Sequence, residues 1–471
     1  MKKIVALTLT AAVALSGTAA LVAGCGGSGN ADYEHTIVFY SSQGDALVQQ
    51  TAAAIRNFEN KYPGWKVEHQ TPGGYDEVRD KVKSDLEANI QPDVAYCYPD
   101  HVAMYLASEQ VLDMKPFINS TETVVGAEDK SYTVGYSAEE IADFIPGYYE
   151  EGKAVNYGGY ESYGYSADSM LTLPFVKSTE LLYYNATALK KLGLSVPKTW
   201  DELWAQAPEI KRHYPKATVL GYDSESNWFI TMCQQQGWGY TSLDNNNNFL
   251  FKPTEDNMPL QNWLNDLHNY WDSGWLTTQQ DYKAYTSALF TKGVENDAGG
   301  IIYCIGSSGG ASHQTPANGS FIASIAPIPG TKKADGTIDN SVISQGPSLV
   351  MFNAGHGVSN ADEKAKMTFL FIKELLDPTF QAAFSIQAGY NPSRESVYEI
   401  DAYKDHMAGS GMTALACQAA RELTDNFFVS PAFPNSSVAR QQVGNALYYV
   451  MRGEKTAEQA LRDAYRNCGG K

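Results

Sequence analysis

The feature that most constrains the fold is an alternation of apolar strands and amphipathic helices that begins at residue 36. Runs rich in β-branched and aromatic residues predict strands at 36–40, 65–68 and 92–96. Between them, apolar residues recur at helical spacing, most clearly over 76–87. Because strand, helix and strand in succession form a parallel βαβ unit, this alternation predicts an α/β fold.

Polar and aromatic residues stand in the loops that follow these predicted strands, namely Gln43, Tyr75 and Tyr98. Ligands of open parallel sheets bind at the carboxyl ends of the strands, so these three residues are candidate binding residues. Asp76 is a fourth candidate, because it lies beside Tyr75 at a strand-to-helix turn. The same position would suit a helix N-cap, and the sequence favours neither role over the other.

Two segments further along give local expectations. Residues 119–170 are irregular and rich in Tyr, Gly, Ser and Glu, and we expect them to form an excursion over the surface. At 197–203 a helix is predicted to begin, with Thr199 as its N-cap and Glu202 completing a capping box.

The N-terminus has the layout of an export signal. Met1-Lys2-Lys3 is positively charged, residues 4–23 are apolar, and the next stretch, 26–30, is rich in Gly and Ser. We expect residues 1–24 to be a cleaved signal peptide and residues 25–34 a flexible tether. The alternative is an uncleaved signal anchor with an incidental cysteine.

The cysteine at the end of the leader carries a second expectation. The run Leu21-Val22-Ala23-Gly24-Cys25 resembles the lipobox of bacterial lipoproteins, in which the leader is cut before the cysteine and the thiol carries lipid. The resemblance implies that Cys25 is lipidated, with palmitate as one of the chains. It also implies a protein anchored to the cell membrane on its extracytoplasmic face.

The charge of the chain excludes one class of partner. The net charge is −18, and cleavage of the leader, which carries Lys2 and Lys3 but no acidic residue, makes it −20. Such an excess of acid repels phosphate backbones, so we expect no nucleic-acid partner. It also disfavours docking on anionic lipid other than through Cys25. The sequence beyond the tether is long enough for two or three domains.

Neither the spacing of the remaining cysteines nor any cofactor-binding motif in the sequence predicts a bound metal or cofactor. The cysteines are far apart and odd in number, and no C-x-x-C pair occurs, so a zinc site is unsupported. We expect most of them to be buried free thiols; the alternative is a single disulfide between two of them, and the sequence does not choose the pair. No G-x-x-x-x-G-K-[ST] motif is present, which excludes a P-loop ATPase. The five residues are Cys97, Cys233, Cys304, Cys417 and Cys468.

A series of landmarks, in order, resembles one family. The motifs are the segments 58–67, 91–94, 173–175, 182–185, 197–203, 326–330 and 453–460. They are similar to those of the extracellular solute-binding proteins of ABC importers, in the large carbohydrate-binding class. Each motif is weak alone, but the ordered set covers nearly all of residues 35–467.

The resemblance implies a periplasmic-binding-protein-like fold, in which two α/β lobes are joined by three crossover segments and enclose a ligand cleft. By analogy the N-terminal lobe comprises 35–176 and 347–392, and the C-terminal lobe comprises 177–346 and 393–471. The crossovers are expected near 174–179, 343–347 and 390–396. The candidate ligand residues at these crossovers are Ser178, Gln345, Gly346 and Tyr390.

Within the family, the sequence resembles the glycerol-3-phosphate-binding branch. The similarity is carried by the segments 144–149, 307–309, 346–349 and 389–392. That branch carries an arginine for the phosphate near 429–435, where this chain has none, and Arg440 is the nearest substitute. An uncharged sugar or oligosaccharide is therefore the predicted ligand, with glycerol 3-phosphate or a glycerophosphodiester as the alternative.

Sugars need directed hydrogen bonds at their hydroxyl edges and an aromatic ring against their C–H face. Trp228 aligns with a ligand-stacking tryptophan of the family, and a core position is the alternative. Ser307 and Ser308 follow a predicted strand at 301–304, where backbone N–H groups would bind an anion or a hydroxyl. Arg440 would either reach the cleft or pair with a surface acid.

Two enzyme classes compete with this interpretation. The segment 306–310 fits G-x-S-x-G, with Ser308 as nucleophile, His356 or His406 as base and Asp377 as acid. Short Gly/Ser runs are common, however, and nothing orients these histidines toward Ser308. A glycoside hydrolase would need two carboxylates beside the sugar, but Asp and Glu are so abundant in this sequence that their presence neither supports nor excludes such an enzyme. We expect a monomeric receptor, not an enzyme, that delivers its ligand to ABC permease subunits served by a separate ATPase.

Overall fold

The computed structural model describes residues 33–244 and 248–470, and the chain from Tyr33 onward forms one compact unit. The predicted leader, Cys25 and most of the predicted tether lie outside the described residues. Within the described ranges, no helix combines the length and the apolar character that a membrane span requires.

One five-stranded sheet forms around the N-terminal strand, in the order β2-β1-β3-β16-β6. Its strands are β1 (Thr36–Tyr40), β2 (Lys66–Gln70), β3 (Val94–Cys97), β6 (Thr172–Pro174) and β16 (Ser348–Met351). β1 runs parallel to β2 and β3, whereas β16 is antiparallel to β3 and β6. The three strands expected at the start of the fold are thus confirmed, with ends displaced by at most two residues.

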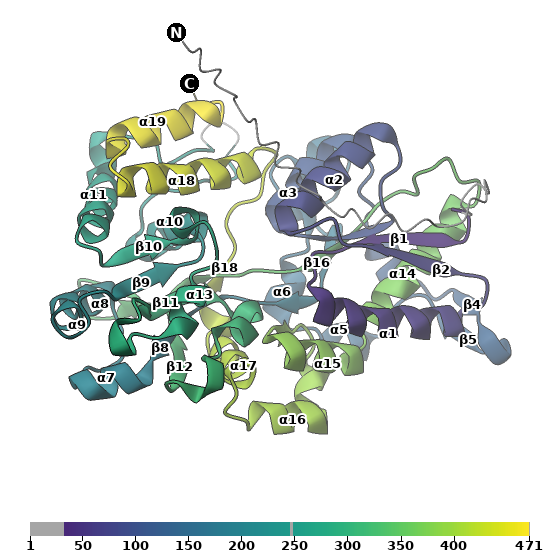
Figure 1. The fold of residues 1–471 in the computed structure, drawn as a ribbon. Coiled ribbons are helices and arrows are strands. Elements are labelled where there is room, and N and C mark those ends of the chain that lie inside the picture. The colour runs from purple at the N-terminus through teal and green to yellow at the C-terminus, as the bar shows by residue number, and fades with distance from the viewer. Residues whose placement is uncertain (1–32, 245–247, 471) are drawn as a thin grey trace, which may run out of the picture. The chain divides into compact units, whose positions relative to one another are not determined.

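Helices cover both faces of this sheet, because successive side chains of a strand point to opposite faces (Figure 1). The helices of this lobe are α1 (Asp45–Lys61), α2 (Tyr75–Ala88), α3 (Pro99–Tyr105), α4 (Lys115–Ile118), α5 (Ala138–Ala142), α6 (Pro146–Glu150), α14 (Ala361–Leu375) and α15 (Pro378–Ala388). Phe39 packs with Phe58 of α1 and Phe371 of α14. Its neighbour Tyr40 packs with Val78 of α2 on the other face.

A second five-stranded sheet has the order β10-β9-β11-β8-β12. Its strands are β8 (Glu180–Asn185), β9 (Thr218–Tyr222), β10 (Leu276–Thr278), β11 (Ile301–Ser307) and β12 (Ala323–Pro327). β9 is parallel to β10 and β11, and β8 is antiparallel to β11 and β12. The two mixed sheets give the two α/β lobes that were predicted.

The second lobe is rich in helices, and α10, α11, α18 and α19 pack against one another above its sheet in Figure 1. The helices that follow the first crossover are α7 (Ala186–Leu192), α8 (Trp200–Ala205), α9 (Ala207–His213), α10 (Glu225–Gln236), α11 (Met258–Asp272), α12 (Gln279–Tyr282) and α13 (Ser287–Lys292). Those that follow the last crossover are α16 (Asp401–Met407), α17 (Met412–Glu422), α18 (Ser436–Met451) and α19 (Ala457–Asn467). One core of buried apolar residues joins most of these helices to the sheet.

Short strand pairs hold the predicted crossover segments side by side. β7 (Val176–Lys177) of the first crossover pairs with β17 (Asn391–Pro392) of the third, whereas β15 (Val342–Ile343), at the start of the second, pairs with β18 (Phe427–Phe428), which lies outside the predicted crossovers. Ser178 and Gln345 exchange both backbone hydrogen bonds, at 3.2 and 2.9 Å. The crossovers therefore meet in one place, while the residue limits drawn for the two lobes remain predictions.

The segment 119–170 is more than a surface excursion, and that expectation is wrong in part. It contains the exposed hairpin β4 (Thr123–Val125) and β5 (Ser131–Thr133), but also buried aromatic residues such as Phe144. The carboxylate of Asp143 accepts a hydrogen bond from Arg394 Nε at 2.7 Å. The abundant tyrosines of this segment supply apolar ring surface that can be buried, which its polar composition conceals.

Glu151, directly after α6, joins two crossovers. Its carboxylate accepts from Lys177 Nζ at 2.5 Å and from Ser344 Oγ at 2.9 Å. Both ends of the ion pair are largely withdrawn from solvent, with 2% of the Lys177 side chain and 13% of the Glu151 side chain exposed. Loss of either partner would leave a buried charge unpaired, so this pair fixes the crossovers to each other.

Two further expectations have mixed outcomes. Thr199 caps α8 as predicted, since its Oγ1 accepts from the Glu202 amide at 3.2 Å. The capping box is wrong, because the Glu202 carboxylate reaches one residue further back and accepts from the Lys198 amide at 2.7 Å. The five cysteines of the described chain are all free and buried.

Candidate functional site

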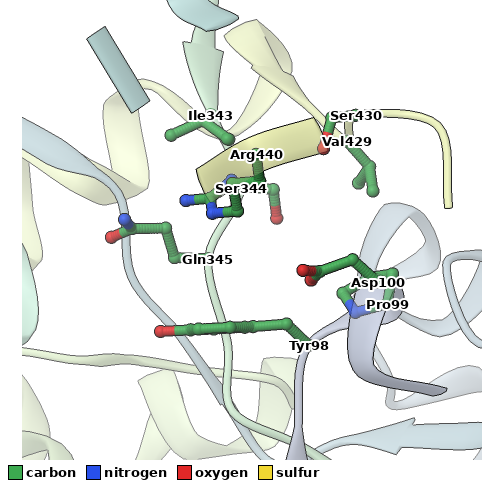
Figure 2. Close-up of a pocket in the computed structure, with 9 residues that line it drawn as sticks. All are labelled: Tyr98, Pro99, Asp100, Ile343, Ser344, Gln345, Val429, Ser430 and Arg440. Carbon is green, nitrogen blue, oxygen red and sulfur yellow. The ribbon is translucent and has the colours of Figure 1, made fainter. Parts of the chain in front are cut away.

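A pocket lies where α3, the crossover at 343–345 and α18 approach one another (Figure 2). It measures about 350 Å³, counting the part that is open to solvent. The residues that line it are Tyr98, Pro99, Asp100, Ile343, Ser344, Gln345, Val429, Ser430 and Arg440. Three of the residues predicted from the sequence, Tyr98, Gln345 and Arg440, are therefore brought together here.

The pocket contains one carboxylate and one guanidinium. In Figure 2 the Asp100 carboxylate and the Arg440 side chain both lie above the Tyr98 ring. Asp100 accepts a hydrogen bond from Ser437 Oγ of α18 at 2.7 Å. Burial opposes ionisation of Asp100, but His101, Arg440 and the Ser437 hydrogen bond outweigh it, and the pKa of Asp100 lies below its ordinary value. The pocket thus offers a strong donor and a strong acceptor with little net charge.

Arg440 is held from behind by a chain of polar side chains in the second lobe. Its Nη2 donates to Asn227 Oδ1. Asn227 Nδ2 in turn donates to Glu180 Oε1 at 2.9 Å, and the Tyr222 hydroxyl donates to Glu180 Oε2 at 2.5 Å. Burial raises the pKa of Glu180 to about 7, although both hydrogen bonds and the charge of Arg440 lower it. One donor of Arg440 is thereby satisfied, which leaves others for a ligand.

Tyrosine rings form the floor of the pocket and its surroundings. Tyr75 and Tyr98 stack with their ring centroids 4.4 Å apart and their planes inclined by 29°. Burial raises the pKa of Tyr75 well above its ordinary value, and the neighbouring phenols of Tyr390 and Tyr98 raise it further. Tyr390 packs against Gly309, where a Cβ atom would lie 2.5 Å from the ring. Three predicted residues, Tyr75, Tyr98 and Tyr390, thus form one aromatic cluster.

The remaining candidates at the crossovers support the pocket wall. The Ser178 hydroxyl lies 3.4 Å from both Gln345 Oε1 and the Gly346 carbonyl oxygen. Gly346 packs closely beneath Tyr98, because a Cβ atom there would lie 3.3 Å from the ring. Ser178 is buried, so its role in this conformation is to position Gln345.

Gln43 and Asp76 are not brought to this pocket. The Gln43 amide is occupied by neighbours of its own lobe, since Nε2 donates to Tyr96 Oη at 2.6 Å and Oε1 accepts from Thr51 Oγ1 at 2.8 Å. The Asp76 side chain is 74% exposed and pairs with Arg79 at 2.8 Å. Asp76 is not the helix cap either, because Gly74 holds the N-cap position of α2.

Trp228 lies in the core of the second lobe and not on the pocket wall. Its side chain is fully buried, and Tyr222 stacks on it with a centroid distance of 4.6 Å and an angle of 13°. Trp200 and Trp263 pack beside it at 5.8 Å. The ring of Trp228, which the resemblance to the family assigned to ligand stacking, is thus covered by other side chains in this structure.

The serine pair has a structural role. Ser307 caps the 3₁₀-helix Ser308–Gln314 by accepting from the Gly309 amide at 3.2 Å. Ser308 is fully buried, and its hydroxyl lies 3.3 Å from the Thr179 amide. The two histidines proposed as its base have other neighbours, since His356 stacks on Tyr33 and His406 packs on Tyr403. Nothing described here prepares Ser308 to act as a nucleophile.

Several residues of the site were missed by sequence reasoning. Asp100 lies two positions after Tyr98, and Pro99 before it is typical of the first turn of a helix, so the segment resembled an ordinary helix start. Its place at the carboxyl end of β3 was a signal that would have found it. Val429 and Ser430 begin the segment 429–435, where the related branch carries its phosphate-binding arginine, but that signal was not extended to these two residues. They belong to a loop far away in the sequence that the tertiary fold brings here.

Comparison with known proteins identifies relatives of this architecture. Residues 53–409 match the family model of the bacterial extracellular solute-binding proteins. The chain is 25% identical over 234 residues to the sn-glycerol-3-phosphate-binding periplasmic protein UgpB of Escherichia coli (strain K12), which is 49% of this chain and 47% of that protein. The chain thus matches the curated relatives over about half of their length.

Solved structures share the fold over nearly the whole chain. UgpB from Mycobacterium tuberculosis in complex with glycerophosphocholine has a TM-score of 0.70 and 18% identity, covering 92% of this chain and 97% of that one. The GacH receptor of Streptomyces glaucescens, solved unliganded and with acarbose, has a TM-score of 0.66 and 18% identity, covering 92% and 98%. These likenesses confirm the predicted two-lobe α/β fold.

Proposed function

Because this chain belongs to the bacterial extracellular solute-binding proteins, we propose that it is the receptor of an ABC importer for a neutral sugar or oligosaccharide. Its work in this proposal is to bind a solute between the lobes and present it to a membrane permease. The ligand stabilises the conformation in which it contacts both lobes, in proportion to its extra affinity for that conformation.

The observation that carries the choice of ligand is that the Asp100 carboxylate and the Arg440 guanidinium both line the pocket that the Tyr98 ring floors. A sugar hydroxyl both donates and accepts, so neighbouring hydroxyls can donate to the carboxylate and accept from the guanidinium. The ring beneath would take the C–H face of the sugar. A phosphate, by contrast, would be placed beside the Asp100 carboxylate, whose low pKa keeps it charged near neutral pH.

A glycerophosphodiester is the second candidate, and Arg440 favours it. Arg440 retains donors beyond the one that binds Asn227, and the guanidinium fork matches the geometry of a phosphodiester. The solved relative with glycerophosphocholine shows that the fold accommodates this class of ligand in another protein. The two candidates differ in charge and are separated by one experiment.

The location and the partners belong to the same proposal. The leader and the Leu-Val-Ala-Gly-Cys run support a chain anchored through lipid on Cys25 at the extracytoplasmic face of the cell membrane. The permease subunits and the separate ATPase would be other proteins. The receptor acts as a monomer that binds and releases its solute without cleaving it.

A thermal-shift screen of the purified protein tests this function. The panel contains maltotriose, acarbose, sn-glycerol 3-phosphate and glycerophosphocholine. A ligand at 100 times its dissociation constant adds about 2.7 kcal/mol to the free energy of unfolding, which is a shift of several degrees. A shift with a sugar supports the main proposal, and a shift with the glycerophosphates alone supports the second. A folded protein that responds to no member of a broad sugar panel contradicts the proposed ligand class.

A further inference from the structure

Tyr285 is one of the most exposed large side chains of the described chain. It is 64% exposed, whereas the tyrosines of the neighbouring strands, Tyr222 and Tyr303, are fully buried. An isolated exposed aromatic residue is ordinary on a protein surface and by itself indicates nothing. Its meaning depends on how firmly it is held and on what lies beside it.

The backbone around Tyr285 is fixed to the sheet of the second lobe. Its neighbour Thr286 donates twice to Asp223 Oδ1, from its amide at 2.6 Å and from its hydroxyl at 2.7 Å. Asp223 directly follows β9, and its own amide donates to the Ile305 carbonyl oxygen of β11 at 2.9 Å. Tyr285 therefore stands at the carboxyl ends of β9 and β11, the edge at which ligands of open α/β sheets bind.

The aromatic cluster of the pocket lies close to this edge. α13, which begins two residues after Tyr285, packs against the 3₁₀-helix Ser308–Gln314, and Gly309 of that helix supports the ring of Tyr390. Burial raises the pKa of Tyr390, and the Tyr285 phenol is near enough to raise it further. Tyr285 of the second lobe thus lies near Tyr390, which neighbours Tyr75 and Tyr98.

We propose that Tyr285 is a ligand-stacking residue that extends the binding site beyond the pocket and selects ligands with more than one sugar ring. The inference rests on the proposed function and adds a residue and a ligand length to it. The hydroxyl groups of a single sugar ring above Tyr98 would form their hydrogen bonds with Asp100 and Arg440. A second ring of the same ligand, leaving the pocket along the sheet edge, would place its C–H face on the exposed face of Tyr285.

The test compares Tyr285→Ala and Tyr285→Phe with wild type by calorimetric titration with maltotriose, acarbose and the matching monosaccharide, D-glucose. Stacking on an aromatic ring is worth about 0.5–1.5 kcal/mol, so Tyr285→Ala is expected to bind the longer ligand about two- to twelvefold more weakly. Tyr285→Phe keeps the ring and should bind within about twofold of wild type. Tyr282→Ala, which removes an exposed tyrosine of α12 three positions away, is the matched control and should have no effect.

A second variant gives an optical readout that does not depend on a loss of affinity. Tyr285→Trp places an indole at this position, and addition of the bound oligosaccharide should shift its emission and protect it from an aqueous quencher, relative to wild type. The inference is overturned if wild type binds the longer ligand, Tyr285→Ala binds it with the same affinity, and the fluorescence of Tyr285→Trp does not change. The proposed function is unaffected by that result. A wild type that binds no sugar overturns both.

Discussion

Two aromatic residues that were predicted to bind the ligand, one in each lobe, have opposite roles in the structure. At the edge of the first sheet, Tyr98 is half-buried and forms the floor of the pocket beside Tyr75. In the second lobe, by contrast, Trp228 is fully buried among aromatic residues, and the ring of Tyr222 stacks on it. In the pocket, the first lobe therefore supplies the Tyr98 ring and the Asp100 carboxylate, and the second lobe supplies the Arg440 guanidinium.

The difference follows from how far each residue lies beyond its strand. Tyr98 directly follows β3 and is itself the N-cap of α3, so its side chain stays at the sheet edge. Trp228 lies four residues after the N-cap of α10, Ser224, by which point the helix has completed a turn. Trp228 lies on the face of α10 that covers the sheet, where its ring packs onto Tyr222 of β9.

The largest expected effect separates a core role of Trp228 from a binding role. Trp228→Ala should lower the free energy of unfolding by about 3–5 kcal/mol, because it leaves a large cavity beside Tyr222. Urea unfolding measures this loss, and titration of the folded variant should give wild-type affinity. Trp228→Phe should lose much less stability. A variant with wild-type stability that binds ligand poorly would contradict the comparison and return Trp228 to the site.

The next effect tests the guanidinium that the second lobe supplies. Arg440→Ala should weaken ligand binding by about 2–4 kcal/mol, because a donor to the ligand is lost and the carboxylate of Asp100 loses a neighbouring positive charge. Calorimetry with the ligand found in the thermal-shift screen measures it. Arg462→Ala, which removes an exposed arginine paired with Glu458 on α19, is the control and should bind normally. Equal affinity in both variants would remove Arg440 from the site.

A smaller effect tests the ring that the first lobe supplies. Tyr98→Ala should weaken binding by about 1–2 kcal/mol, since stacking and the floor of the pocket are lost. Tyr98→Phe retains the ring and should stay within about twofold of wild type by the same titration. If Tyr98→Phe were as weak as Tyr98→Ala, the hydroxyl and not the ring would carry the contact, and the contrast between Tyr98 and Trp228 would need revision.

The smallest effect concerns pH and the buried acid behind Arg440. Burial raises the pKa of Glu180 from 4.5 to about 7, so between these values the folded protein holds a proton that the unfolded chain releases. The stabilisation is complete below about pH 4.5 and is lost as the pH rises through about 7. Between pH 6 and pH 8 the free energy of unfolding should fall by about 1 kcal/mol through this group.

Chemical unfolding at several pH values measures this loss in wild type and in Glu180→Gln, whose side chain does not titrate. The decline attributable to Glu180 should be absent from the variant, while the contribution of Asp223, whose pKa burial raises to about 6, remains in both. Parallel curves for the two proteins would show that Glu180 does not exchange its proton in this range.

Much of the fold was predictable because it rests on local patterns. The alternation of strands and helices over the first hundred residues and the cap at Thr199 follow from residue type and spacing, whereas the crossovers were placed by resemblance to the family. The burial of the segment that contains Asp143 and Glu151 was not predictable, because its partners Arg394, Lys177 and Ser344 are far away in the sequence. Polar composition alone does not distinguish a surface loop from one tied to the crossovers.

The site was predictable only where a residue lies at a strand end or a crossover. Tyr98 and Gln345 met that condition and line the pocket, and Arg440 was suggested by the resemblance to the family. Gln43 lies at a strand end too, but its amide is taken up by Tyr96 and Thr51. Whether the hydrogen-bonding groups of a polar side chain are occupied within its own lobe depends on neighbours that only the three-dimensional structure shows.

A crystal structure of the protein with the ligand that gives the largest thermal shift tests the proposed site most directly. We expect a neutral sugar that lies on the Tyr98 ring and forms hydrogen bonds to Asp100 and Arg440. A phosphoryl group bound to Arg440 would contradict the choice of ligand. A sugar bound away from Tyr98, Asp100 and Arg440 would contradict the assignment of the site itself.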